Sequence, residues 1–258
     1  MNYKYSILGL ALCFFSSNGL SQSFEYQGAV CESDFGKALI NPESMEFKRM
    51  REGAEKSEQF RTYFLETLAR DFKKNGLTIR IRTKSDRASV DKVTLKKTFS
   101  SVPIESSEPW EKVGKFKYEK NIYQDKESYT YSIDIKPAIK INEVASVKDV
   151  LGHSAQKLLK DLLPGWDFAG TSILLLGPIE STKIKLKDDV EIDLWQLEQE
   201  ANAEASIKLS TESSVGFEQL ASALKPWNTI LCRENSSRTS KFIDILEEQK
   251  ESKIISWK

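Results

Sequence analysis

The three cysteines of this 258-residue chain limit its fold more than any other feature. Cys13 lies in an apolar N-terminal segment that we expect to be removed, which leaves Cys31 and Cys232. Two cysteines in an oxidising compartment most simply form one disulfide; two free buried thiols or a reactive nucleophile are the alternatives. A nucleophilic cysteine needs a paired histidine, and the chain has only one. We therefore predict a Cys31–Cys232 bond that closes a loop of about 200 residues, brings the chain ends together and stabilises the fold by ~5 kcal/mol.

Residues 1–23 have the order of regions that is typical of a secretory signal peptide. Lys4 supplies a positive charge, an apolar run follows at Ile7–Phe15, and small polar residues come next. Cleavage is expected after Ser21 or Ser23. An apolar run of about nine residues is too short to cross a bilayer of roughly 30 Å. We therefore expect an exported protein, periplasmic or extracellular, with no transmembrane segment in the mature chain.

The segment Leu39–Phe47 is similar to a short L-x-x-P-x-S-x-x-F signature that follows a cysteine in small exported bacterial proteins. It covers fewer than a dozen residues and carries no known chemistry. It favours a bacterial origin and gives no family.

Hydrophobic periodicity predicts both helices and strands. Between residues 56 and 74, Phe60, Phe64 and Phe72 recur at helical spacing, which predicts a helix. The period then changes to two over 77–82 and 93–99, which predicts a β-hairpin. Further strands are expected at 112–119, 128–141, 170–176, 182–186, 206–211, 229–233 and 254–257, and further helices at 32–40, 146–163, 193–205, 216–224 and 240–250.

This order of elements predicts an α+β fold, with antiparallel β-meanders packed against amphipathic helices in two closely packed subdomains. Residues 24–143 form the first subdomain, a helix plus an antiparallel meander. Residues 144–258 form the second, a mixed α/β unit that the disulfide joins to the N-terminus. Its first helix begins with Ser146 and Asp149 at capping-box spacing.

His153 is the only histidine, so a Ser-His-Asp triad or a histidine-bearing metal site must use it. The chain contains no G-x-S-x-G elbow and no glycine-rich phosphate loop. Zinc sites usually need two or more His or Cys ligands, and the cysteines are assigned to the disulfide. We therefore predict no catalytic residue, no metal and no cofactor, and we place His153 on the polar side of its helix.

Acidic residues are dense between 188 and 204. Carboxylates at this density can bind calcium, or two of them can serve as a glycosidase pair across a cleft. The glycine of an EF-hand loop is absent, and the sequence does not show the separation of any pair. A solvated acidic turn and helix is the interpretation that we favour. The residues concerned are Asp188, Asp189, Glu191, Asp193, Glu198, Glu200 and Glu204.

Basic residues are concentrated in the predicted hairpin. Residues 73–97 carry nine lysines and arginines against two aspartates, a local net charge of +7. Alternation along the strands places five of these cations on one face. Such a face can bind an anionic partner or ligand, or it can be a solvated surface that the acidic 188–204 segment covers. The five predicted binding residues are Arg80, Arg82, Lys84, Lys92 and Lys96.

These observations predict an exported, non-catalytic protein of the bacterial envelope. Its partner is expected to be an envelope protein or an anionic polymer or lipid surface. Nucleic acid is excluded by export, by the zero net charge and by the lack of aromatics in the hairpin. Two alternatives stay open: a carboxylate-dependent hydrolase of glycan or cell-wall material with a cleft lined by Trp166 or Trp195, and a carrier that encloses an apolar ligand against the helix of Phe60, Phe64 and Phe72.

Overall fold

The computed structural model describes residues 22–31, 41, 43–123, 126–198, 200–232, 238–249 and 252–257. The expected helix at 32–40 and residues 1–21 of the expected signal peptide lie outside this part of the chain. The first strand begins at Gln22. A cleavage after Ser23 would therefore remove residues that pair with the neighbouring strand, whereas a cleavage after Ser21 would leave the strand intact.

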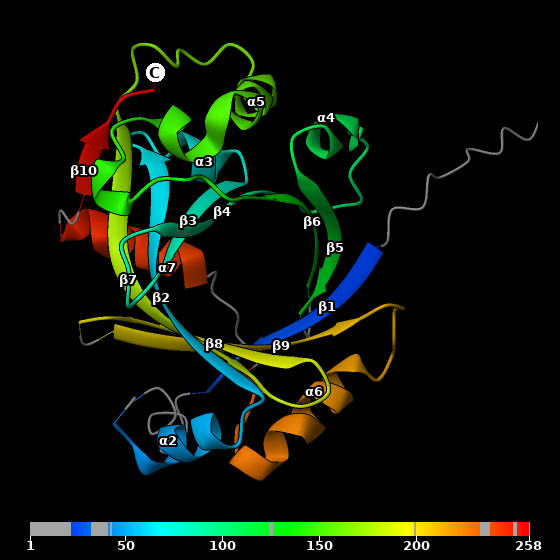
Figure 1. The fold of residues 1–258 in the computed structure, drawn as a ribbon. Helices are drawn as coiled ribbons and strands as arrows, with labels where there is room; N and C mark the ends of the chain where they lie inside the picture. Colours follow the sequence, from blue (N-terminus) through cyan, green and yellow to red (C-terminus); the bar gives the residue numbers. More distant parts are fainter. Residues whose placement is uncertain are drawn as a thin grey trace, which may run out of the picture.

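Ten strands form one sheet in the order β10-β7-β2-β3-β4-β6-β5-β1-β9-β8, and pairing of β8 with β7 closes nine of them into a barrel (Figure 1). β10 lies outside this ring, on the edge of β7. The β1–β5 ladder is parallel and the other ladders of the barrel are antiparallel. The strands are β1 (Gln22–Ala29), β2 (Lys56–Thr67), β3 (Leu77–Lys84), β4 (Val90–Phe99), β5 (Lys115–Ile122), β6 (Glu127–Ile135), β7 (Ile173–Lys185), β8 (Val190–Leu197), β9 (Glu200–Leu209) and β10 (Ser252–Ile255).

The prediction of an α+β fold built from antiparallel meanders is therefore wrong. The N-terminal strand β1 inserts between β5 and β9, so one continuous sheet joins the two ranges that we expected to be subdomains. A closed barrel has no free edge, and every strand in it has one face inside and one face outside.

The expected helix at 56–74 is the long strand β2 followed by the short helix α3 (Asp71–Lys74). A spacing of four residues, as between Phe60 and Phe64, fits one side of a helix and also one side of a strand. Phe64 packs in one hydrophobic cluster and Leu65 in another, so this part of the strand is buried on both faces. A strand buried on both faces shows no alternation, which is why periodicity failed to identify it.

The expected helix at 193–205 is also wrong, because these residues belong to strands β8 and β9. Ile192 and Leu194 are buried in an apolar cluster, and Glu191 and Asp193 face the opposite side. The strands meet in a turn at Glu198, which adopts φ 52°. The strands expected at 170–176 and 182–186 are one strand, β7, with a cis peptide bond between Gly177 and Pro178 inside it.

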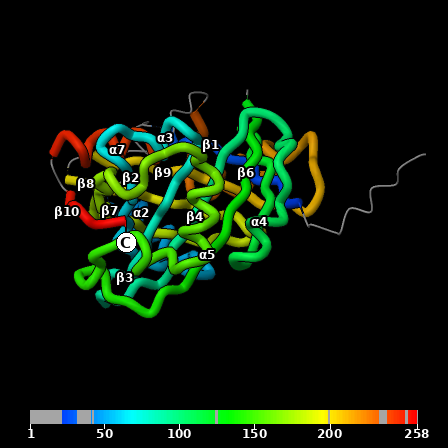
Figure 2. The backbone as a smooth tube through the Cα atoms, turned by 90° about the horizontal axis from the view of Figure 1, so that it is seen from above, coloured from blue at the N-terminus to red at the C-terminus, as the bar shows by residue number. Residues whose placement is uncertain are grey.

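Helices cover the outside of the barrel and one of its ends. α5 packs on the apolar outer faces of β3 and β4, and its predicted Ser146–Asp149 capping box is confirmed: Ser146 N donates to Asp149 Oδ2 at 2.7 Å. α2 and α6 cover the outer faces of β8 and β9. α3 and α7 lie together at one end of the barrel (Figures 1 and 2). The remaining elements are α2 (Met45–Glu52), α4 (Glu108–Glu111), α5 (Val147–Leu162), α6 (Gly216–Leu224), α7 (Arg238–Glu248) and the 3₁₀ turns η1 (Ile141–Glu143) and η2 (Lys225–Trp227).

A disulfide joins Cys31 to Cys232, with 5.0 Å between the two Cα atoms. Backbone hydrogen bonds flank it: Cys232 N donates to Ala29 O at 2.8 Å, and Cys31 N donates to Ile230 O at 2.9 Å. The bond therefore attaches the segment that precedes α7 to the end of β1. Of the helices in the described part of the chain, none has the length and apolarity needed to cross a membrane.

Replacing Phe64 by alanine should lower the free energy of unfolding by about 3–5 kcal/mol, because the ring is fully buried and its loss leaves a cavity beside Trp195. Urea denaturation measures this change. The matched control is Leu68→Ala, just beyond the end of β2, where the side chain is 68% exposed and the expected change is below about 0.5 kcal/mol. Equal effects of the two substitutions would contradict the assignment of Phe64 to the core.

Candidate functional site: the charged interior of the barrel

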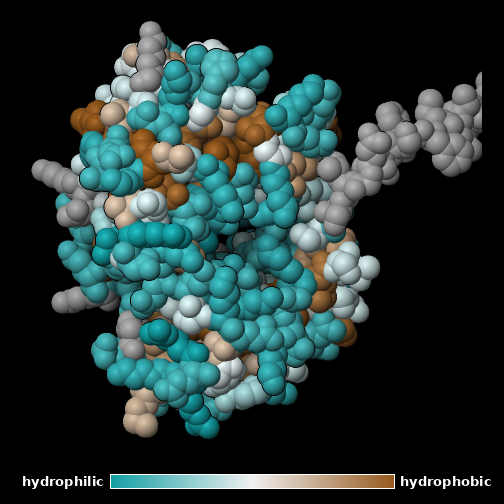
Figure 3. Space-filling model, viewed as in Figure 1, coloured by the Kyte–Doolittle hydropathy of each residue, from teal (hydrophilic) through white to brown (hydrophobic). Residues whose placement is uncertain are grey.

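The barrel encloses a cavity of about 1020 Å³, which we call the barrel cavity. Its mouth is visible as a small dark hollow ringed by hydrophilic side chains (Figure 3). Eleven basic and seven acidic side chains line it, which gives a net charge of +4. The basic residues are Lys73, Lys74, Arg80, Arg82, Lys92, Lys96, Lys117, Lys126, Lys183, Lys208 and Arg238, and the acidic residues are Glu25, Glu119, Glu127, Asp134, Glu191, Asp193 and Glu204.

Strand alternation explains why β3 contributes cations to the cavity and apolar side chains to the core. Arg80 and Arg82 line the cavity, whereas Ile79 and Ile81 are fully buried in the cluster that includes α5. The outer face of the strand is apolar because helices cover it, and the inner face is polar because the barrel is too wide for side chains to fill.

The structure brings four of the five predicted binding residues into the barrel cavity: Arg80, Arg82, Lys92 and Lys96. Lys84 lies farther along β3, at the margin of the barrel, where its Nζ is 3.2 Å from Glu58 Oε1. The predicted basic face therefore points into the barrel and not toward an external partner. An anion reaches it only by entering the cavity.

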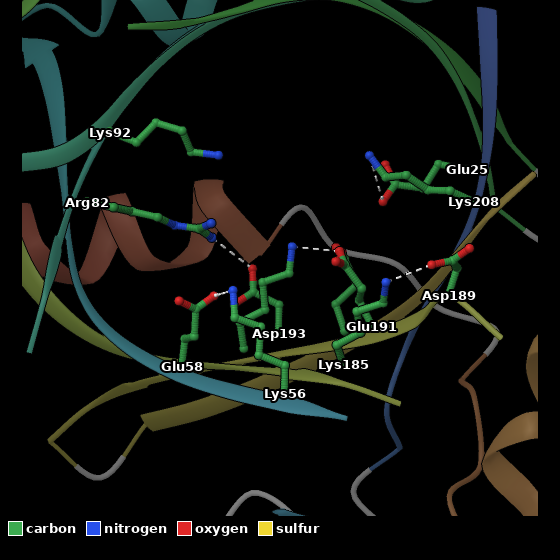
Figure 4. A network of polar contacts seen from close by, with 12 residues as sticks. Glu25, Lys56, Glu58, Arg82, Lys92, Lys185, Asp189, Glu191, Asp193 and Lys208 are labelled. Carbon is green, nitrogen blue, oxygen red and sulfur yellow. Dashed lines mark hydrogen bonds and ion pairs between the residues drawn. The ribbon is translucent and has the colours of Figure 1, made fainter. Parts of the chain in front are cut away.

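Asp193 on β8 forms the most buried ion pairs of the cavity. Its Oδ2 is 3.1 Å from Arg82 Nη2 on β3 and 3.2 Å from Arg238 Nη2 on α7, and Arg82 reaches across the barrel to it (Figure 4). Arg238 also lies over the ring of Trp195, 4.2 Å from its centroid. Burial alone would raise the pKa of Asp193, but the neighbouring guanidiniums, led by Arg238 and Arg82, outweigh it and lower the pKa to about 2. Asp193 of the acidic 188–204 segment thus neutralises Arg82 inside the barrel, whereas the alternative had this segment cover a solvated sheet face.

Two further groups of carboxylates are neutralised by lysines. Asp134 on β6 hydrogen-bonds Lys117 and accepts from Thr94 Oγ1 at 2.8 Å. Burial opposes ionisation of Asp134, yet the hydrogen bond from Lys117 and the charge of Lys92 lower its pKa to about 2. Figure 4 shows Lys92 extending into the cavity from β4. The charge of this carboxylate is therefore already balanced.

The other group joins β1, β5 and β9. Lys208 on β9 hydrogen-bonds Glu119 on β5, and its Nζ is 3.8 Å from Glu25 Oε1 on β1 (Figure 4). Burial raises the pKa of Glu25 despite Lys208, and the nearby charge of Glu119 raises it further. Burial also acts on Glu119, but Lys208 outweighs it and lowers the pKa of that carboxyl. Lys208 thus pairs with two carboxylates, and it lies closer to Glu119 than to Glu25.

Arg80 and Lys96 differ from the other inward cations of β3 and β4. Neither forms an ion pair or a side-chain hydrogen bond with any residue that the structure describes, although Lys96 lies opposite Thr78 and Arg80 opposite Thr94 on the shared ladder. Burial, and then the charge of Arg82, lower the pKa of Arg80 to about 9. Burial also lowers the pKa of Lys96, against the charges of Glu25 and Glu119. These two cations therefore lack a close counter-charge.

Sequence reasoning missed the residues that other strands and α7 contribute to the cavity. Each strand residue among them has a buried or half-buried neighbour in the sequence. An alternation of charged and less exposed positions is a signal that the sequence does contain. What it lacks is the information that nine strands share one interior. The missed residues are Glu25, Lys117, Glu119, Glu127, Asp134, Lys183, Lys208 and Arg238.

The other candidate residues do not form sites. His153 is exposed on α5, as predicted. Asp189 pairs with Lys185 at 2.8 Å in the β7–β8 turn and is mostly exposed. Across the residues that the structure describes, no group of three or more His, Cys, Asp or Glu side chains is arranged to hold a metal ion. The expected calcium alternative therefore has no support from the geometry.

Neither the glycan hydrolase with a cleft lined by Trp166 or Trp195 nor the carrier of an apolar ligand fits the cavity wall. Trp195 is fully buried beneath α7 against Phe64 and Phe242, and Trp166 packs on Phe168, so neither lines a glycan cleft. An apolar ligand has no place in a cavity lined by eighteen charged side chains.

The sequence matches no protein-family model, and no curated protein resembles it. In structure it is similar to HpAC1 of Hippeastrum, provisionally assigned as an adenylyl cyclase and reported to have a dominant triphosphatase activity. The TM-score is 0.58 at 15% identity, over 85% of this chain and 94% of that one. A protein from Bacillus halodurans, also provisionally assigned as an adenylate cyclase, aligns with a TM-score of 0.46 at 15% identity, over 84% of this chain and 95% of that one.

The similarity to the Hippeastrum protein, like the strand order, supports the fold alone: a closed mixed β-barrel. The expectation of a non-catalytic envelope protein is corrected, because the structure is similar to a protein with a reported triphosphatase activity and the basic face predicted to bind a partner lies inside the barrel. The similarity also lends no support to the expected secretion.

Enzymes of phosphoryl transfer commonly bind a divalent metal with the phosphate chain, and the donor set of the barrel cavity does not fit one. Asp193, Asp134 and Glu119 each bind a lysine or an arginine directly. Hard divalent cations need several oxygen ligands at one point, and the carboxylates of the described residues form no such group.

Replacing Asp193 by asparagine should lower the free energy of unfolding by about 3 kcal/mol at pH 7, because two guanidiniums lose their buried partner. The contribution of Asp193 is fully present above its unfolded pKa of 3.8 and is lost as the pH falls toward 2, since folding lowers the pKa. The difference between the two proteins should therefore shrink between pH 4 and pH 2. Denaturant titrations at several pH values measure it, and Asp189→Asn is the exposed control; a constant difference would contradict the assignment.

Proposed function

We propose that the protein is an enzyme that binds the phosphate chain of a triphosphate compound in the barrel cavity and cleaves one of its phosphoanhydride bonds. The observation that carries this proposal is the excess of cations lining the cavity, above all the half-buried Arg80 and Lys96, which have no close counter-charge among the described residues. The fold similarity to a protein with a reported triphosphatase activity supports the same class of ligand.

The charge balance favours a polyanion over a neutral ligand. Eleven cations face seven carboxylates, and a desolvated cation gains more from an anion than a solvated one does. A phosphate chain offers several oxygens at intervals, so one ligand can satisfy Arg80 and Lys96 together. Lys92 and Lys117 stand along the same wall, on β4 and β5.

The arrangement also suits the chemistry of phosphoryl transfer. Such a reaction requires little covalent participation by the protein, and it depends on positioning and on stabilising negative charge in the transition state. Fixed lysines and arginines in an enclosed site supply that stabilisation without reorganising. The strands of the barrel hold these side chains more rigidly than loops would.

Purified protein should release phosphate from inorganic tripolyphosphate or from ATP. Arg80→Met and Lys96→Met should each lower kcat/KM by about a hundredfold, because each removes one cation from the reacting chain. Lys84→Met, on the same strand but paired with Glu58 at the barrel margin, is the matched control and should change kcat/KM by less than about threefold. Phosphate release and cyclic AMP formation are measured in the same reaction.

The proposal fails if the wild-type protein binds but cleaves neither compound, or if the Arg80 and Lys96 variants keep full activity. Urea denaturation of each variant shows whether a loss of activity reflects unfolding. The control variant excludes a general effect of removing one positive charge.

The affinity for tripolyphosphate should fall by about tenfold or more between pH 7.5 and pH 9.5. Burial lowers the pKa of Lys92 to about 8, against the charge of Asp134 and with that of Arg80, Arg82 and Lys117. Lys92 therefore loses its proton in this range in the free protein, whereas the guanidiniums of the cavity stay charged. Isothermal titration calorimetry measures the affinity. Lys92→Met should flatten the pH dependence, and an unchanged profile in that variant would contradict the role of Lys92.

A further inference from the structure

We propose that the barrel cavity binds its phosphate chain free of divalent metal, so that protein cations alone neutralise the phosphate oxygens. This inference rests on the proposed function and departs from the metal dependence that is common in enzymes of phosphoryl transfer. It identifies the ligand as the uncomplexed polyanion.

The first argument is that Asp193, the most buried carboxylate of the cavity, is already paired with two cations. The guanidinium of Arg82 and that of Arg238 both contact Asp193 Oδ2, and Trp195 Nε1 donates to Oδ1 at 3.1 Å. A metal ion at Asp193 would have to displace the guanidiniums of Arg82 and Arg238 from Oδ2. Like charges held this close together would repel it.

The second argument concerns the remaining carboxylates. Glu204 is 3.4 Å from Arg238, and Glu191 is 2.6 Å from Lys183. Glu25 is the carboxylate with the weakest pairing, at 3.8 Å from Lys208, and burial favours its protonated form, which is a poor metal ligand. Two positions along β1, Gln27 is neutral and donates to Asn121 Oδ1 at 3.1 Å. The inward face of β1 therefore offers one carboxylate and not a pair.

The third argument is the nature of the unsatisfied groups. Of the fully buried side-chain atoms of the described cavity wall, those that lack a hydrogen-bond partner are Arg82 Nε and Arg238 Nε. Both are donors, so the wall is short of acceptors. A vacant metal site would leave carboxylate oxygens unsatisfied instead. An added anion corrects this imbalance, whereas an added cation increases it.

Calorimetric titration of the wild-type protein with inorganic tripolyphosphate, once in EDTA and once in excess Mg²⁺, tests the inference at physiological ionic strength. We expect binding in EDTA, and an affinity at least about tenfold weaker in Mg²⁺, because the complexed chain carries less negative charge. Arg80→Met and Lys96→Met should weaken binding in EDTA by about tenfold or more, and Lys84→Met should not. Titration of the free protein with Mn²⁺, followed by electron paramagnetic resonance, should show no tight site.

The outcomes separate this inference from the proposed function. Binding that requires Mg²⁺, or a tight Mn²⁺ site in the free protein, overturns the metal-free inference and leaves the proposed function standing. Binding in EDTA without cleavage of any triphosphate supports the inference and overturns the proposed activity. A failure to bind tripolyphosphate under either condition overturns both.

Discussion

The ion pairs of Asp193 connect three parts of the protein that are remote in sequence. They join β3 through Arg82 and α7 through Arg238 to β8, and they lie inside the barrel, where each partner would be costly to bury alone. The guanidinium of Arg238 also stacks on Trp195, so the same contact orients the helix at the end of the barrel. The disulfide before α7 acts on the same region, because it attaches that segment to β1. The position of α7, and with it the shape of the barrel cavity, depends on these contacts.

Closure of the barrel then determines the electrostatics of the interior. The outer faces of the strands pack against helices and are apolar, so the charges of the alternating positions gather in one enclosed space. Most of them neutralise one another across strands. The balance leaves positive charge near Arg80 and Lys96, where the burial that lowers their pKa values also strengthens their attraction for an anion. The proposed binding of a phosphate chain follows from this excess and not from any single motif.

Local sequence patterns predicted some elements well and others wrongly, for identifiable reasons. The β3–β4 hairpin was found because its alternation is strict, with isoleucines on one face and arginines on the other. The capping box of Ser146 was found because it depends on neighbours only three residues apart. β2 was mistaken for a helix because burial on both faces removes the alternation. Residues 193–205 were mistaken for a helix because they are rich in carboxylates. They form two strands whose aliphatic side chains face out of the barrel and are buried under helices.

The sequence by itself determined which residues alternate and where Arg80, Arg82, Lys92 and Lys96 share a face. Only the tertiary structure decided that this face points inward. A two-residue alternation distinguishes the two sides of a strand but does not say which side faces water, and that depends on how the sheet closes. Closure is set by pairings as remote as β1 with β9 and β7 with β8, which no local pattern encodes. The same charges would form an exposed face on an open meander, and in the closed barrel they line an enclosed cavity.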